Sequence, residues 1–317
     1  MTNRLARYIG NGNVEIVSEP VPAVAAGGLL VRTEACGLCS GELMSWYMDR
    51  KLPHVLGHEV AGIVEVSEDD RFPVGSRVFP HHHAPCLRCA LCLEGKFVHC
   101  PQWKSTKLVP GGMAERFVVA PENLTDTVRC DDLRPQDAAL LEPLGCVMKA
   151  LRLAGSRDRA AVVGLGFMGL LHMFALDDPV GYDLNPGRVD WARGKGLRVG
   201  DAAKPEMVET VFVCPGSQAA FDFALSMVNP GGTIVMFAPL APGEDLRVPQ
   251  AAYFRDITIR NAYSAGPNDT QDALEVIRAG KLSADQVVSH FIGLDELPKA
   301  YQQMKAGEIL KPMVLIP

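Results

Sequence analysis

The segment Ala160-Ala-Val-Val-Gly-Leu-Gly-Phe-Met-Gly169 combines a short apolar run with three closely spaced glycines. The apolar run predicts a buried strand, and the glycines predict a tight turn that opens a helix. Glycines at this spacing let the backbone approach the pyrophosphate of a dinucleotide, which lies at the positively polarised end of the helix. The predicted cofactor-binding residues of this loop are Gly164, Leu165, Gly166, Phe167, Met168 and Gly169.

An acidic residue in the expected place supports this interpretation. The next predicted strand, 180–182, is followed by Asp183, about twenty residues after the first glycine, where an acid commonly binds the ribose hydroxyls. An acid there repels a 2′-phosphate, so NAD is favoured over NADP. Arg188 is also predicted to contact the cofactor, because a nearby arginine can accommodate that phosphate. The structural alternative is a tight strand–helix turn in an α/β protein that binds no nucleotide.

The glycine loop begins a repeating pattern of apolar strands and helices, which predicts a doubly wound parallel sheet. Its expected strands are 160–163, 180–182, 210–214, 233–237 and 257–260. The chain before about residue 145 instead predicts an irregular β-rich domain with strands at 29–34, 60–66, 77–79 and 115–119. After this repeating segment, the sequence predicts a helix at 269–279, a helical stretch at 294–305 and a strand at 313–316.

Length and composition place the chain among ordinary globular proteins, with two domains expected. It has 317 residues, of which 48% are hydrophobic and 21% charged, and its formal net charge is -6. The acidic balance argues against a nucleic-acid partner, and the longest uncharged run is short for a membrane span. Nine cysteines without a secretory signal indicate a reducing compartment, so the expected location is the cytoplasm.

Four cysteines lie close together in the β-rich part, at positions 86, 89, 92 and 100. Four thiolates at this spacing predict a closed tetrahedral S₄ site, the geometry of structural zinc. Buried free thiols or disulfides are the alternative. The predicted ligands of the structural zinc are Cys86, Cys89, Cys92 and Cys100, in a lobe of about residues 84–102.

A second group of possible metal ligands is dispersed along the chain. Cys39 lies in Cys36-Gly-Leu-Cys39, His58 and Glu59 lie in Gly57-His-Glu59, and Glu142 lies in Glu142-Pro-Leu144. A thiolate, an imidazole and a carboxylate can hold a catalytic zinc with one open position. Taken one at a time, these residues are also consistent with a core thiol, a core histidine and an acid at a helix N-terminus.

These motifs, in this order, resemble those of the zinc-containing medium-chain alcohol and polyol dehydrogenases, which include sorbitol and threonine dehydrogenases. The resemblance runs nearly end to end and includes Asp183-Leu-Asn-Pro186. It implies a GroES-like catalytic domain at 1–145 and 265–317 and a Rossmann NAD-binding domain at 146–264. By this resemblance Cys39, His58 and Glu142 bind the catalytic zinc, and Glu59 binds it directly or through water. Two zinc ions per chain and NAD are the implied cofactors.

The chain departs from that family at the proton relay. The family usually has Ser or Thr two residues after the zinc cysteine, where this chain has Gly41, and often a His three residues further on, where it has Met44. Ser40 is one predicted substitute, and the triplet His81-His82-His83 is another, with His82 expected to reach the pocket; ordered water alone is the third possibility. Imidazole suits proton transfer because its ordinary pKa is close to neutral. A solvated or structural histidine cluster is the alternative for His82.

The sequence therefore predicts a zinc-dependent oxidoreductase that transfers a hydride between NAD and a secondary alcohol of a small polar substrate, such as a polyol, sugar or amino-sugar. Ser40, His82 and Glu59 are its expected catalytic residues. The resemblance also implies a homodimer or homotetramer, and strand 233–237 is expected near the edge that joins the subunits. The alternatives are a threonine-type amino-alcohol dehydrogenase and a zinc-stabilised NAD-binding protein without catalysis.

Overall fold

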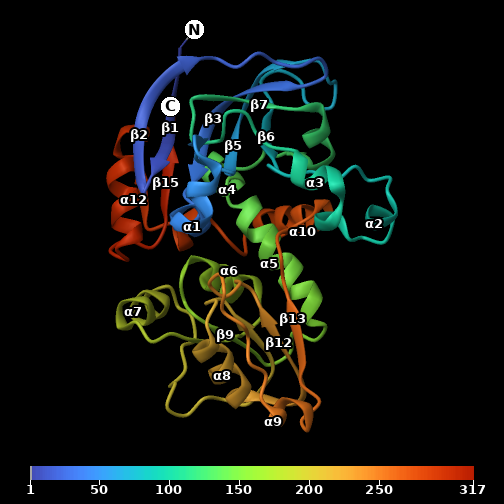
Figure 1. Ribbon diagram of the computed structural model, residues 1–317, viewed down its shortest axis with the longest axis vertical. Helices are drawn as coiled ribbons and strands as arrows, with labels where there is room; N and C mark the ends of the chain where they lie inside the picture. Colours follow the sequence, from blue (N-terminus) through green and yellow to red (C-terminus); the bar gives the residue numbers. More distant parts are fainter. Residues whose placement is uncertain (1) are drawn as a thin grey trace. The chain divides into compact units, whose positions relative to one another are not determined.

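A computed structural model of the chain describes residues 2–317, which form two compact units. The first unit contains residues 2–143, 265–278 and 283–317, and the second contains residues 144–264 and 279–282. The first unit thus takes segments from both ends of the sequence. The elements of each unit are labelled in Figure 1.

Two sheets form the first unit. A three-stranded sheet has the order β2-β1-β4, and a larger, seven-stranded sheet has the order β14-β15-β3-β5-β6-β8, with β7 paired to β3. The strands are β1 (Thr2–Gly10), β2 (Asn13–Pro20), β3 (Leu29–Gly37), β4 (His54–Val55), β5 (Glu59–Ser67), β6 (Arg77–Pro80), β7 (Arg116–Val119), β8 (Thr127–Arg129), β14 (His290–Ile292) and β15 (Pro312–Leu315). Alternate residues along much of β3, such as Leu29 and Val31, are fully buried and contribute to the core of the unit.

The helices of the first unit are short, apart from α10 and α12. They are α1 (Ser45–Met48), α2 (Ala90–Leu93), α3 (Pro101–Ser105), α4 (Pro135–Ala138), α10 (Pro267–Arg278), α11 (Ala284–Val287) and α12 (Leu297–Lys305). The 3₁₀ helices are η1 (Ser40–Leu43), η2 (Asp49–Lys51), η3 (Phe97–His99), η4 (Pro121–Asp126) and η5 (Leu294–Glu296). Helix α12 packs against β2 and β15, so the C-terminal segment is an integral part of this unit (Figure 1).

The second unit is built on a five-stranded parallel sheet with the order β10-β9-β11-β12-β13. Its strands are β9 (Ala160–Val163), β10 (Val180–Tyr182), β11 (Val208–Val213), β12 (Val228–Met236) and β13 (Thr258–Asn261). Its helices are α6 (Phe167–Ala175), α7 (Pro186–Gly194), α8 (Gln218–Met227), α9 (Gln250–Tyr253) and most of α5 (Leu141–Ala154), which begins in the first unit. Strand β12 lies next to the edge strand β13, and the expectation that subunits join near 233–237 stays a prediction.

This sheet is a shortened form of the doubly wound arrangement. The usual order of six strands is 3-2-1-4-5-6, and here the third strand is reduced to a single bridge between Gly181 and Val199. No helix occurs between that bridge and β11. Tyr182 covers the shortened region: its ring is buried, and its hydroxyl accepts a hydrogen bond of 2.9 Å from the Glu206 N–H.

None of the helices within residues 2–317 combines the length and the apolar character that a lipid bilayer crossing requires.

Candidate metal centres and cofactor loop

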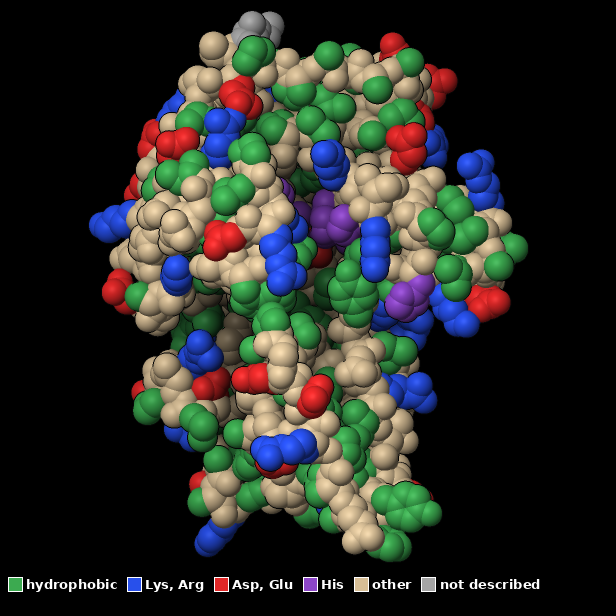
Figure 2. All heavy atoms as spheres, viewed as in Figure 1, with side chains coloured by type: hydrophobic (Ala, Val, Ile, Leu, Met, Phe, Trp, Pro, Cys, Tyr) green, Lys and Arg blue, Asp and Glu red, His purple; other side chains and the backbone are tan. Residues whose placement is uncertain are grey.

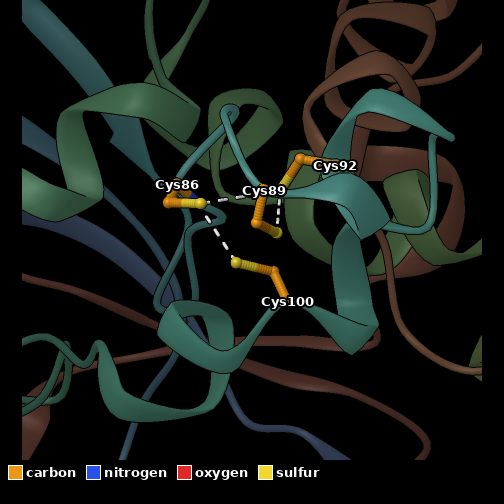
Figure 3. Close-up of side chains that lie close together, drawn as sticks. All are labelled: Cys86, Cys89, Cys92 and Cys100. Atoms are coloured by element: carbon orange, nitrogen blue, oxygen red, sulfur yellow. Dashed lines mark hydrogen bonds between the residues drawn. The ribbon is translucent and has the colours of Figure 1, made fainter.

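The four cysteines of the predicted structural site converge in one lobe of the first unit (Figure 3). Their sulfur atoms all lie within 4.8 Å of one another, with Cys89 3.5 Å and Cys86 4.0 Å from Cys92. A tetrahedron with Zn–S bonds of about 2.3 Å has edges of about 3.8 Å, so these separations fit a zinc ion. Backbone N–H groups of Arg88 and Cys89 lower the pKa of Cys86 to about 6, which favours the thiolate that a metal needs.

The second candidate metal centre consists of Cys39, His58 and Glu59. Cys39 follows β3, and Glu59 is the first residue of β5. The two strands are antiparallel, and Gly37 is opposite Glu59, so the pairing of β3 with β5 brings these segments together. The three ligand atoms lie within 4.8 Å of one another. A thiolate, an imidazole and a carboxylate fit zinc with room for a further ligand.

A buried carboxylate orients His58. Glu42 is in η1, three residues after Cys39, and its Oε1 accepts a hydrogen bond of 2.8 Å from the Gly57 N–H and lies 3.3 Å from Nδ1 of His58. Burial lowers the pKa of His58, but the negative charges of Cys39 and Glu42 outweigh it and hold that pKa well above the ordinary value. Glu42 therefore fixes the orientation of the His58 ring, and Nε2 of His58 remains available to bind a metal ion.

A buried lysine neutralises the carboxylate of Glu59. Lys311, directly before β15, is fully buried, and its Nζ donates to Oε2 of Glu59 and to the Leu38 carbonyl oxygen, the latter at 2.8 Å. A Cβ at Gly37 would overlap that Glu59 oxygen, so the ion pair also requires glycine there. The residue directly before the C-terminal strand thus supplies the positive charge that balances Glu59.

The remaining predicted zinc ligand, Glu142, is close to histidines of the segment after β6. Its carboxylate oxygen, a nitrogen of His81 and a nitrogen of His82 lie within 4.8 Å of one another. The His82 ring is 4.7 Å from the His58 ring, centroid to centroid, so the two groups of ligands adjoin. Figure 2 shows histidine side chains gathered in a hollow on this face of the first unit.

Burial has the largest effect on the pKa values of His81, His82 and Glu142. It raises the pKa of Glu142 to about 7 and lowers the pKa of His81 to about 4. It also lowers the pKa of His82 well below its ordinary value, and the neighbouring His58 adds to that effect. His82 thus has a lower pKa than the near-neutral value expected of a relay.

The predicted relay residues differ in exposure. Ser40 is exposed at the start of η1, next to Cys39, whereas His82 is partly covered. At Gly41 a Cβ would meet only the Cys39 sulfur, at an ordinary contact distance of 3.5 Å. The absence of a hydroxyl at position 41 is therefore not imposed by lack of space.

The glycine loop has the geometry expected of a dinucleotide site. It joins β9 to α6, and Gly164 has a φ of +90°, which side chains rarely adopt. A Cβ at Gly169 would overlap the Gly164 carbonyl oxygen, so this glycine allows the helix to approach the strand. A Cβ at Gly166 would meet only Nη1 of Arg188, at 3.9 Å, so the loop backbone is open on that side to a ligand.

Asp183 is connected to this loop. Its Oδ2 accepts a hydrogen bond of 2.6 Å from the Leu165 N–H, and its Oδ1 accepts one of 2.7 Å from the Asn185 N–H. Nη1 of Arg188 lies 3.7 Å from the same Oδ2. The loop, Asp183 and Arg188 therefore lie together, and their binding of a cofactor stays a prediction.

Glu42 and Lys311 were not predicted to lie at these sites, and His81 was predicted only as part of the histidine triplet and not as a possible metal ligand. Glu42 had a usable sequence signal, because it is three residues from Cys39. Lys311 had none, because it is 252 residues from its partner Glu59. His81 is adjacent to the predicted His82, but only the fold reveals that its Nε2 lies 4.0 Å from Glu142.

Comparisons with known proteins agree with both units. Residues 25–129 match the family described as alcohol dehydrogenase GroES-like domain, and residues 163–279 match zinc-binding dehydrogenase. The chain is 23% identical to D-xylulose reductase A of Aspergillus oryzae, over 96% of this chain and 94% of that protein. It is 27% identical to L-threonine 3-dehydrogenase of Sinorhizobium medicae, over 91% of each.

A solved structure has the same fold. It is described as a putative zinc-binding dehydrogenase from Sinorhizobium meliloti 1021 bound to NADP, and it matches with a TM-score of 0.87 and 23% identity over 100% of both chains. The chain belongs to the zinc-containing medium-chain dehydrogenase/reductase family, and its enzyme class is that of the NAD(P)-dependent alcohol dehydrogenases. The predicted family, fold class and enzyme class are confirmed.

Proposed function

We propose that this protein is a zinc-dependent dehydrogenase that transfers a hydride between NAD and a secondary alcohol of a polyol, sugar or amino-sugar. The observation that carries the proposal is the convergence of Cys39, His58 and Glu59 in the unit that matches the GroES-like family. A glutamate rather than a cysteine at position 142 favours the polyol branch, as does the similarity to a D-xylulose reductase.

Cys39, His58 and Glu59 are the residues that would hold the catalytic zinc, and Glu142 is proposed as a further ligand. Zinc held there would act as a Lewis acid that lowers the pKa of the substrate hydroxyl. The protein's own contribution is orientation and charge. Glu42 fixes the His58 ring, and Lys311 balances the Glu59 carboxylate. Cys86, Cys89, Cys92 and Cys100 would hold a structural zinc.

The glycine loop would bind the pyrophosphate of the cofactor, and NAD would accept the hydride from the alcohol carbon. We place NAD before NADP because the Asp183 carboxylate would lie beside the 2′-position of the ribose. Arg188 is the residue that would favour NADP, and the similar Sinorhizobium meliloti protein has NADP bound. The distance of 3.7 Å between Arg188 and Asp183 means that each charge offsets the other.

The substrate hydroxyl must lose its proton before the hydride leaves. Ser40 is the favoured acceptor, together with water, because its hydroxyl is exposed beside Cys39. His82 is the second candidate, although its lowered pKa makes it a weaker base near neutral pH. Ser40→Ala should lower kcat by about 10²-fold or more, and Gly41→Ser in the same chain should restore part of that loss because the site has room for the hydroxyl.

A threonine-type amino-alcohol dehydrogenase is the second candidate function. The 27% identity to an L-threonine 3-dehydrogenase favours it. Both candidates oxidise a secondary alcohol, and they differ in whether the substrate carries an ammonium group and a carboxylate. The substrate therefore distinguishes them, whereas the metal centre does not.

The proposed location is the cytoplasm, supported by the convergence of the Cys86, Cys89, Cys92 and Cys100 thiols as metal ligands, which a reducing compartment maintains. The decisive experiment for function is a panel of polyols, sugars, amino-sugars and L-threonine, assayed with NAD and with NADP by the absorbance of the reduced cofactor. We expect turnover of a polyol or sugar with NAD. Turnover of L-threonine alone would support the second candidate, and no turnover of any alcohol would contradict both.

A further inference from the structure

We propose that His81, His82 and Glu142 form a second divalent-metal site next to the Cys39–His58–Glu59 centre. Their ligand atoms lie within 4.8 Å of one another, so one ion could contact all three. The family resemblance assigns a metal role to Glu142 only, and neither histidine has one. The proposal concerns metal content and does not depend on which alcohol is the substrate.

The first argument is the orientation of His81. Its Nδ1 faces the His83 carbonyl oxygen, which can only accept a hydrogen bond, and Oδ2 of Asp126 lies 3.6 Å from the same nitrogen, beyond hydrogen-bond distance. Nδ1 therefore carries the proton, and Nε2 keeps a lone pair. A histidine that donates through one nitrogen to a carbonyl or carboxylate and presents the other as a ligand is the usual arrangement around metals.

The second argument is that this lone pair has no hydrogen-bond partner. His81 is fully buried, and among the described residues neither its Nε2 nor Nδ1 of His82 has a hydrogen-bond partner. Nε2 of His81 lies 4.0 Å from Oε1 of Glu142, which is too far for a direct hydrogen bond. Buried unpaired nitrogen atoms are rare, and an unseen ion or water is the usual explanation.

The third argument is that the backbone holds the two histidines in place. Nδ2 of Asn123 donates to the carbonyl oxygens of His81 and His82, at 2.9 and 3.1 Å. Asn123 is itself fully buried, so the segment is anchored from behind. A rigid backbone lowers the entropy that is lost when side chains bind an ion.

Charge and chemistry indicate which ion would bind. Glu142 is buried, and a cation bound at Nε2 of His81 would favour its charged carboxylate form. Two imidazoles and one carboxylate form the donor set of zinc sites that keep an open position. A carboxylate has two oxygens, so Glu142 can serve this site and still be a ligand of the first. The site is thus suited to Zn²⁺, with Co²⁺ as a spectroscopic substitute.

The test is metal analysis of the full-length protein after loading with Zn²⁺ and dialysis. The parent should retain three equivalents: the cysteine lobe, the Cys39 centre and the new site. His81→Asn combined with His82→Asn should retain two. The matched control is His83→Asn, whose parent ring donates to the Thr106 carbonyl oxygen and lies against Trp103, and this variant should retain three.

A second measurement does not require the double variant to fold. Protein with zinc in the cysteine lobe and Co²⁺ elsewhere should show cobalt absorption bands in the Cys39→Ser variant, without a sulfur-to-cobalt charge-transfer band. Single His81→Gln should lose those bands. The proposal would be overturned if the parent retained only two zinc equivalents, or if His81→Gln left the cobalt bands unchanged. Water would then be the partner of the histidine nitrogen atoms. An absence of alcohol oxidation would count against the proposed function and leave this result untouched.

Discussion

Among single residues, the Glu59–Lys311 pair has the clearest energetic consequence. Both side chains are about 1% exposed, so their charges are stabilised by each other rather than by water. Removing one partner of such a pair leaves a buried charge and typically costs about 3–5 kcal/mol. The same pair holds the Glu59 carboxylate beside Cys39 and His58, so stability and metal geometry depend on one contact.

The first prediction is that Lys311→Met lowers the free energy of unfolding of the metal-free protein by about 3–5 kcal/mol. The loss should be smaller in the zinc-loaded protein, because the ion then balances Glu59. Denaturant titration with and without zinc measures both values. Lys311→Arg is the control that retains the charge. An equal loss with and without zinc would mean that Lys311 does not act through Glu59.

The site residues that could be predicted from the sequence are those that lie close together along the chain. Cys86, Cys89, Cys92 and Cys100 lie within one short segment, and their spacing alone indicated the geometry that the lobe has. The Cys39–His58–Glu59 group required the family resemblance, because strand pairing creates it. Lys311 could not be predicted, because its role depends on β15 pairing with β3 at the far end of the sequence.

Among secondary-structure elements, the apolar strands of the second unit were predicted best. Strands β9 and β10 have the predicted bounds, because buried parallel strands are short apolar runs between clear breaks. The hairpin of β1 and β2 was missed, although its turn contains Asn11-Gly12, both with positive φ, a strong hairpin signal. Charged residues along β1 and β2 obscured the alternation, since β2 is at the edge of its sheet.

The second prediction concerns the cysteine lobe as an element. After zinc is removed with a chelator, Cys86 should react with iodoacetamide at pH 7, and its rate should fall as the pH drops through about 6, because the thiolate is then protonated. Cys130 and Cys214 should react much more slowly, since burial raises the pKa of each to about 12. Mass spectrometry of the labelled peptides measures all three rates. Equal labelling of the three cysteines would contradict this assignment.

At the scale of the whole molecule, the edge of the second unit's sheet at β13 is the feature that bears on assembly. Strand β13 has one unpaired edge, and the exposed aromatic side chains Tyr253 and Phe254 are at the C-terminal end of α9 before it, with 78% and 73% of their surfaces accessible. An unprotected strand edge beside apolar surface readily pairs with another chain. This arrangement supports the proposed homodimer or homotetramer.

The third prediction is that the protein sediments as a dimer or tetramer at micromolar concentration. Tyr253→Glu with Phe254→Asp should shift it toward the monomer, because the charges would have to be buried in the interface. Leu184→Asp is the matched control, since Leu184 is 93% exposed after β10, at the opposite edge of the sheet. Analytical ultracentrifugation distinguishes the species. A monomeric parent would reject the assembly.

The central claim is that Cys39, His58 and Glu59 hold the zinc on which alcohol oxidation depends, and Cys39→Ser tests it most directly. Zinc content and NAD-dependent turnover of the best polyol or sugar should be measured together in parent and variant, with circular dichroism as the check on folding. The variant should lose one zinc equivalent and nearly all turnover while it keeps its fold. Unchanged zinc content, or full turnover by a variant that has lost the ion, would contradict the claim.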